Sequence, residues 1–217
     1  MDVYEALYTT RAMRRMRPDP IPYSVQARIL DTAIRAPSGA GLQPWRFLLV
    51  DDPALKAQLA SYYREGHKQI DEWVAETEAA AQANPDDPGS AGFLANLRSS
   101  RHLADHFEDV PLLLFGFVQN DTSGANILFA IWNAMLAARA EGVGSGFTTL
   151  LNSHAEAVKT LLGVPTDQGW EMACCVALGY PTGRWGVPKR RPAHEVSARN
   201  SWDGALGFQV PEPLWPE

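Results

Sequence analysis

The 217-residue sequence is short of cysteine and of positive charge. Its two cysteines, Cys174 and Cys175, are adjacent within an apolar run. They provide neither a disulfide framework nor the spacing of metal ligands, so we expect buried, reduced thiols. The formal net charge of −6 argues against a surface built for nucleic acids or acidic membranes. We therefore expect neither of these as a partner.

The sequence also shows no long apolar run and no leader-like pattern in its opening residues. No run reaches membrane-spanning length, and the opening MDVYEALYTTR lacks a basic region followed by an apolar stretch. We therefore expect a soluble cytoplasmic protein. With 46% hydrophobic residues, the chain can bury a substantial core, and its length suits a single domain over residues 1–217.

Several catalytic signatures are absent. There is no GxGxxG opening a helix after a strand and no GxxxxGK[ST], so neither a Rossmann dinucleotide site nor a P-loop is supported. His102 and His106 share a helix face, but no HExxH context or third ligand accompanies them. Ser38 and Ser145 lack the GxSxG elbow of a hydrolase. We expect no metal and no hydrolytic chemistry.

The hydrophobic pattern predicts three buried strands, over residues 45–50, 110–118 and the run EMACCVALGYP from residue 171. The helices are expected between them: a short one opened by Asp2 and Glu5, one over 25–35 capped by Ser24, one from Asp52 through Tyr62, one over 124–141, and one opened by Ser153 and Glu156 and closed by Gly163. The run GVGSGF, with Gly142, Gly144 and Gly146, is expected to be a flexible stop after the fourth helix.

Two stretches stand outside this pattern. Residues 66–109 are polar and alanine-rich and are broken by NPDDPGSAG, which predicts two peripheral helices with a mobile link. Such a segment is either a lid over a site or a simple excursion. The final residues, 202–217, are rich in proline, and we expect an extended C-terminal arm that lies across a neighbouring chain.

The run APSGAGLQPWRF, residues 36–47, reads as a shaped loop between a helix and a strand. Gly39 and Gly41 permit positive φ or the close approach of a ligand, and Pro37 stiffens the entry. Ser38 and Gln43 add polar side chains beside this backbone. The loop is therefore either part of a binding site for a planar ligand or an ordinary connection.

Basic residues gather near each end of this acidic chain. The first cluster holds Arg11, Arg14, Arg15 and Arg17, and the second holds Arg184, Lys189, Arg190 and Arg191. Guanidinium groups match phosphate oxygens two at a time, so the clusters predict a shared phosphate site. The alternative is a solvated charged face.

Four blocks in series resemble the FMN-dependent nitroreductase family: TTRAMRRMRPDPIP, APSGAGLQPWRFLLV, ILFAIWNAMLAARAEGVGSGF, and VALGYP followed by KRRP. The resemblance covers nearly the whole chain. It implies an α+β fold with a central, mainly antiparallel sheet flanked by helices. It also implies an intertwined homodimer with two FMN sites at its interface.

The resemblance carries over a set of FMN-binding residues. Arg11 and Arg14 match residues that hold the phosphate and the polar ring edge, with Ala12 and Met13 between them and Arg15 as a possible substitute. Pro37, Ser38, Gly39, Gly41 and Gln43 match the loop that reaches the flavin from the partner subunit. Thr148, Thr149 and Leu150 match the segment facing N5, and Lys189 and Arg191 match the C-terminal basic pair. Many relatives have serine at Ala12 and asparagine at Gly41, so backbone groups or Arg14 would have to replace those two contacts.

The implied activity is transfer of a hydride from NADH or NADPH, through FMN, to a small aromatic or quinone-like acceptor by a ping-pong mechanism. No catalytic side chain is needed. TTLLNSHAEAVKTLLGVP also resembles the iodotyrosine deiodinase branch, whose lid clamps a halotyrosine with a Glu, a Tyr and a Lys. Candidates for that clamp are Tyr62, Glu65, Lys68, Glu72, Glu76 and Glu78. A third reading is a flavin carrier or sensor without turnover.

Overall fold

The computed structural model describes residues 1–121 and 123–216. They form two compact units. One is Ala12–Gly183, and the other combines Met1–Arg11 with the chain from Arg184 onward. The single domain over residues 1–217 stays a prediction.

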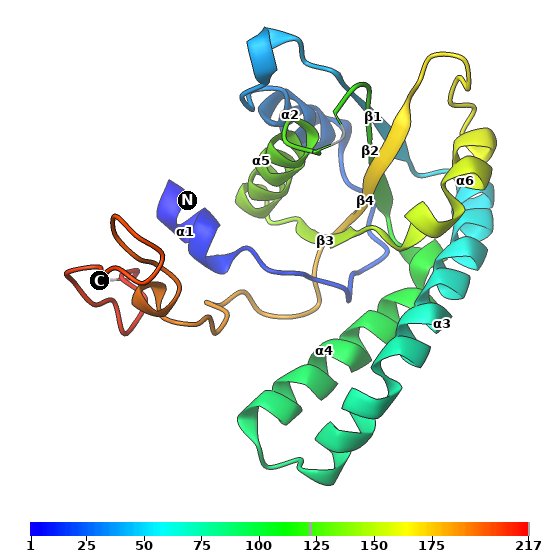
Figure 1. Cartoon of the computed structure of the whole chain (residues 1–217). Helices are drawn as coiled ribbons and strands as arrows, with labels where there is room; N and C mark the ends of the chain where they lie inside the picture. The colour runs from blue at the N-terminus through cyan, green and yellow to red at the C-terminus, as the bar shows by residue number, and fades with distance from the viewer. Residues whose placement is uncertain (122, 217) are drawn as a thin grey trace. The chain divides into compact units, whose positions relative to one another are not determined.

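The larger unit is built on a four-stranded sheet, seen in Figure 1. Its strands are β1 (Trp45–Val50), β2 (Leu112–Val118), β3 (Gly144–Thr148) and β4 (Glu171–Gly179). They stand in the order β1-β2-β4-β3, and every neighbouring pair is antiparallel. The three predicted strands and the antiparallel sheet are confirmed, whereas β3 was not predicted.

β3 lies where a flexible glycine stop was expected. Only Gly142 takes a left-handed conformation, with φ +74°, while Gly144 and Gly146 belong to the strand. A Cβ on Gly144 would stand 2.8 Å from the Cβ of Met13. The prediction of three flexible glycines was therefore wrong at two of them, because those two allow a close approach between chain segments.

Helices cover both faces of the sheet. On one face, α2 (Tyr23–Ala33) and α5 (Ile127–Ala140) pack against β2 residues such as Leu114. On the other, α3 (Pro53–Ala83), α4 (Pro88–Asp105) and α6 (Ala155–Leu161) pack against the alternate residues Leu113 and Phe115. Because successive side chains of a strand point to opposite faces, the fully apolar β2 serves both cores. This arrangement confirms the α+β class.

Two of the four predicted helix N-caps are confirmed. The carboxylate of Asp2 accepts from Glu5 N at 2.7 Å and opens α1 (Val3–Thr9). Asp52 accepts from Leu55 N at 2.8 Å, with Pro53 in the first turn of α3. In both cases the acidic side chain satisfies a backbone N–H that has no partner within the helix.

The other two predicted caps were wrong. α2 begins at Tyr23 after Pro22, so Ser24 lies inside the first turn, and the helix ends at Ala33 instead of Arg35. Ser153 donates its hydroxyl to Leu150 O at 2.9 Å within a 3₁₀ turn. α6 then begins at Ala155 without a side-chain cap. Proline's fixed φ and a competing local hydrogen bond account for these shifts.

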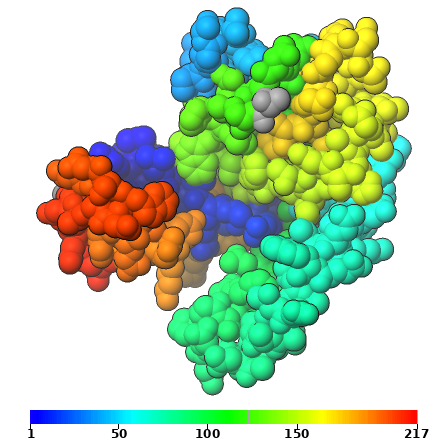
Figure 2. All heavy atoms as spheres, viewed as in Figure 1, coloured from blue at the N-terminus to red at the C-terminus, as the bar shows by residue number. Residues whose placement is uncertain are grey.

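The segment 66–109 holds two helices, but the first of them is continuous with the helix that begins at Pro53. α3 passes Gly66 without a break. A Cβ at Gly66 would meet Leu150 O at 2.8 Å, so the glycine allows the helix to pack closely against residue 150. Arg101 of α4 ties the pair together through Asp71 at 2.9 Å and Glu78 at 2.7 Å. Figure 1 shows the far ends of both helices beyond the sheet, and in Figure 2 the same part of the chain projects from the rest of the larger unit. Whether they act as a lid stays a prediction.

The smaller unit contains α1 and a single 3₁₀ turn, η4 (Ala193–Glu195). The ring of Tyr8 lies 5.8 Å from that of Trp215, and His194 Nδ1 accepts from Val210 N at 3.1 Å. Residues 202–216 contain no helix or strand, and the arm that lies across a neighbouring chain stays a prediction. Among the described residues, no helix has both the length and the apolar character needed to cross a membrane.

Candidate functional site

The segment Ala12–Arg15 runs beside β3. Ala12 forms a parallel bridge with Ser145, and Met13 N donates to Ser145 O at 2.9 Å. Met13 is buried against Gly144, and Thr182 N donates to Arg15 O at 3.0 Å. The main chain therefore fixes the segment on both sides of Arg14.

Arg14 and Arg15 differ in their partners. The half-buried Arg14 side chain passes Gly146 and makes no hydrogen bond or ion pair with any described residue. Arg15 Nη1 lies 3.3 Å from His102 Nδ1. Burial lowers the pKa of His102, and the charges of Arg15 and His106 act in the same direction. Arg14 is therefore the guanidinium available to a ligand, while Arg15 already contacts α4.

The segment Thr148–Leu150 leaves the end of β3. Leu150 N donates to Thr148 Oγ1 at 3.2 Å, so this N–H is already used. Thr149 is exposed, and within the described part of the chain its N–H has no hydrogen-bond partner. α3 supports the segment through the close approach of Gly66 to Leu150. Of the three residues predicted here, Thr149 offers the available backbone donor.

The glycine loop is held at the start of α5. Gly39 N donates to the side-chain oxygen of Asn126 at 2.7 Å, and Gln43 N donates to Ser38 Oγ at 3.3 Å. Gly41 has φ +70°, and Gln43 has φ +49°. Positive φ is free of strain for glycine but sparsely populated by other residues, so the loop has one defined shape. Pro37 is exposed at its entry.

Asp121 fixes the turn that presents Asn126. Its carboxylate accepts from the backbone N–H of Asn126 at 2.9 Å and of Ile127 at 3.3 Å. Partial burial raises the pKa of Asp121, but these hydrogen bonds outweigh it and hold that pKa below its ordinary value. The ionised carboxylate thus closes the first turn of α5, which begins at Ile127 and not at the predicted Gly124.

The predicted residues of the larger unit do not all meet within one chain. The glycine loop is attached to the first turn of α5, whereas Ala12 and Met13 are attached to Ser145, beyond its last turn. A helix of 14 residues is about 21 Å long. Figure 1 shows the loop and the Ala12–Arg15 segment toward opposite ends of α5.

The remaining basic residues belong to the smaller unit. Arg11 Nη2 donates to Arg184 O at 2.7 Å, which joins the first cluster to the start of the second. Lys189 and Arg191 are exposed, and their side chains make no ion pair with a described residue. Arg190 instead donates to the Lys189 carbonyl at 3.0 Å. Arg11, Lys189 and Arg191 therefore lie in one unit.

Sequence reasoning missed Ser145, Asn126, Asp121 and His102 as the residues that hold these segments. Ser145, Asn126 and His102 act on partners distant in sequence, such as Asn126 on Gly39, so no local spacing reveals them. The one local signal was Asp121, an acidic residue shortly before a helix.

These residues fit a phosphorylated planar cofactor. In the larger unit, Arg14 has no acidic partner among the described residues, and in the smaller unit Lys189 and Arg191 have none, so each of these side chains can meet an anionic group of a ligand. The Thr149 N–H supplies a backbone donor, and the loop around Gly41 presents main chain without a bulky side chain.

Comparison with known proteins shows that the chain belongs to the nitroreductase family. A family model described as the nitroreductase family matches residues 7–180. A 5,6-dimethylbenzimidazole synthase of Rhodospirillum rubrum is 29% identical over 196 residues, which cover 87% of this chain and 86% of that protein. An NADH dehydrogenase of Thermus thermophilus is 29% identical over 196 residues, covering 88% and 92%.

A solved structure shows the same fold. It is oxidized iodotyrosine deiodinase bound to FMN and 3-iodo-L-tyrosine, with a TM-score of 0.67 at 22% sequence identity. The match covers 87% of this chain and 95% of that chain. The predicted nitroreductase-like α+β fold is therefore confirmed.

Proposed function

We propose that this chain, which belongs to the nitroreductase family, is an FMN-dependent oxidoreductase that passes electrons from NADH or NADPH to a small aromatic or quinone-like acceptor. When bound, FMN would supply the two-electron chemistry, as a hydride acceptor and then a donor. The observation that carries the proposal is the main-chain attachment of Ala12–Arg15 to β3, because the Thr149 N–H follows that same strand.

Each group of residues has its own part. Arg14 would neutralise negative charge at the polar edge of the flavin ring, and the Thr149 N–H would hydrogen-bond the reactive edge. Arg11, Lys189 and Arg191 would hold the phosphate, with Arg11 oriented by its bond to Arg184 O at 2.7 Å. Arg15 would support the segment through His102. No side chain is asked to act as an acid, a base or a nucleophile.

The glycine loop would reach the flavin from a second copy of the chain. The span of α5 separates the loop from Ala12–Arg15 within one chain, so a complete site needs two chains. α5 also exposes Leu128 by 46%, Phe129 by 55% and Trp132 by 40%, and β3 exposes Phe147 by 39%. Large apolar side chains that are exposed together on one helix and a nearby strand are typical of an interface. These observations support the homodimer.

A deiodinase-like activity is the second candidate, supported by the likeness to the structure that binds 3-iodo-L-tyrosine. Two of the candidate clamp residues on α3 already contact other side chains. Glu78 is engaged by Arg101 at 2.7 Å, and Glu65 Oε2 lies 3.7 Å from His154 Nε2. Lys68 lies six positions beyond Tyr62 and so projects from another side of the helix. The contacts therefore favour the first candidate.

Ping-pong kinetics are expected with NADH or NADPH as donor and a nitroarene or quinone as acceptor. Both substrates would use one face of one flavin and so exclude each other. Initial rates over a matrix of donor and acceptor concentrations should give parallel double-reciprocal lines. Intersecting lines would mean a ternary complex. If no acceptor accelerates the oxidation of NADH or NADPH, the protein would instead be a flavin carrier or sensor without turnover.

A further inference from the structure

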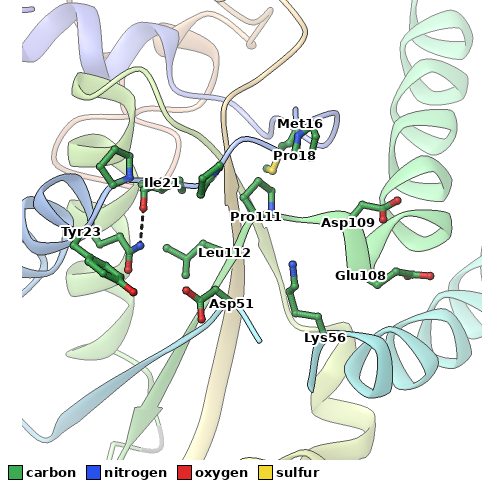
Figure 3. Close-up of a pocket in the computed structure, with 13 residues that line it drawn as sticks. Met16, Pro18, Ile21, Tyr23, Asp51, Lys56, Glu108, Asp109, Pro111 and Leu112 are labelled. Atoms are coloured by element: carbon green, nitrogen blue, oxygen red, sulfur yellow. Dashed lines mark hydrogen bonds between the residues drawn. The ribbon is translucent and has the colours of Figure 1, made fainter. Parts of the chain in front are cut away.

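A cavity of about 880 Å³ lies in the larger unit, away from the residues assigned to the flavin (Figure 3). It opens at the end of the sheet where β1 finishes and β2 begins. One wall is the proline-rich segment of residues 16–22 with the start of α2, and the other comes from α3 and the turn that precedes β2. Cavities of several hundred Å³ are the size used for small-molecule ligands.

Lys56 is the cation of this cavity. It is only 8% exposed, and its Nζ donates to Val110 O at 2.7 Å. An ammonium carries three N–H donors, so two remain for another partner. No carboxylate oxygen of the described residues lies within 4.0 Å of this Nζ. Burial lowers the pKa of Lys56, opposed by the charges of Asp51, Asp109 and Asp52.

Asp51 is the carboxylate that the cavity leaves without a partner. The other two acidic residues of the lining are engaged: Glu108 pairs with Arg64 at 2.8 Å and Asp109 with His106 at 3.1 Å. Asp51 makes no ion pair with a described residue. In Figure 3, Lys56 points from α3 toward the opening that Asp51 and Pro111 frame. Two opposite charges thus share one cavity without meeting.

The surface beside these charges is apolar and stiff. Pro18, Pro20 and Pro111 line the cavity together with Leu112 and Ile21. Gln26 Nε2 donates to Ile21 O at 2.7 Å and so holds the proline segment against α2. Because proline fixes φ and these contacts are already formed, the wall needs little ordering when a ligand binds.

We propose that this cavity binds a free α-amino acid with an apolar side chain, its carboxylate on Lys56, its ammonium on Asp51 and its side chain against the proline wall. A simple anion would be attracted by Lys56 but repelled by the unpaired carboxylate of Asp51. A simple amine would be attracted by Asp51 but repelled by Lys56. A zwitterion satisfies both charges and brings no net charge. The site is separate from the proposed function, and the two can fail independently.

The test is calorimetric titration of the flavin-loaded protein with three matched probes: L-leucine, 4-methylpentanoate, which lacks the ammonium, and isoamylamine, which lacks the carboxylate. Aliphatic probes are chosen because planar aromatic ones would also stack at a flavin. L-leucine is expected to bind at least about 10-fold more tightly than either analogue, since each loses one charge-assisted contact.

Two variants assign the contacts. Lys56→Met should weaken the binding of L-leucine at least about 10-fold, so that L-leucine no longer binds more tightly than isoamylamine. In Asp51→Asn, L-leucine should no longer bind more tightly than 4-methylpentanoate. Arg98→Met removes an exposed cation of α4 that has no ion pair among the described residues; it is the control and should bind as wild type. Asp51 is exposed, so its variant tests the site even if Lys56→Met fails to fold. No detectable binding of L-leucine, or unchanged binding in Asp51→Asn, would overturn the proposal.

Discussion

Replacing Arg191 with alanine is expected to weaken FMN binding by about 10- to 150-fold, because a charge-assisted hydrogen bond to phosphate is worth roughly 1.5–3 kcal/mol. Arg11→Ala should have a similar effect. Its guanidinium also bonds Arg184 O at 2.7 Å, so this variant removes both the phosphate contact and the tie to the C-terminal segment. Arg191 has no such second bond and gives the cleaner measurement.

The measurement is titration of FMN into each apoprotein, followed by the quenching of flavin fluorescence. Arg46→Ala is the matched control, since Arg46 is an exposed arginine of β1 without an ion pair among the described residues. It should bind FMN as wild type. If both Arg11→Ala and Arg191→Ala bind FMN with wild-type affinity, these arginines do not hold the phosphate and belong to a solvated charged face.

Sedimentation of the same samples tests the shared site. If the glycine loop of one chain completes the flavin site of another, FMN and the dimer stabilise each other. Removing FMN should then shift the protein toward monomer. A stable apo monomer that binds FMN normally would remove the two-chain site while leaving the fold intact.

Gly144→Ala is expected to lower the free energy of unfolding by about 1–3 kcal/mol, the usual cost of overpacking. The new Cβ would stand 2.8 Å from the Cβ and 3.2 Å from the Cγ of Met13. Neither side yields easily, because Gly144 is paired with Gly179 in the sheet and Met13 N is bonded to Ser145 O. FMN affinity should fall as well, since Ala12–Arg15 would be displaced from β3.

Urea unfolding followed by circular dichroism measures the loss. Gly92→Ala is the control: it lies in α4 with nothing within 4 Å of the new Cβ, so helix propensity should raise stability by up to about 1 kcal/mol. A Gly144→Ala protein as stable as wild type would mean that the Ala12–Arg15 segment is not fixed against β3 in solution.

The sequence predicted β1, β2 and β4 because each is a mainly apolar run of strand length, as is typical of a buried strand. It missed β3 because GSGFT carries no such run. The small residues of β3 are dictated by Met13, a neighbour distant in sequence. Because this contact selects small residues, β3 lacks the hydrophobic pattern by which a strand is predicted from sequence.

For the candidate site too, part could be predicted from the sequence and part required the structure. The basic residues and the glycine loop were visible from residue type alone. The structure was needed to show that Arg14 and not Arg15 is available, since only folding brings His102 to Arg15. It also showed that Leu150 N is taken by Thr148. Such assignments depend on which donors are already used, and no local pattern contains that information.

The identity of the bound cofactor tests the central claim most directly. The purified protein is heated, and the released material is separated beside FMN and FAD standards, with an absorbance spectrum of the protein taken first. The account predicts a yellow protein that releases FMN. Recovery of FAD, or of no flavin even after reconstitution with FMN, would contradict it.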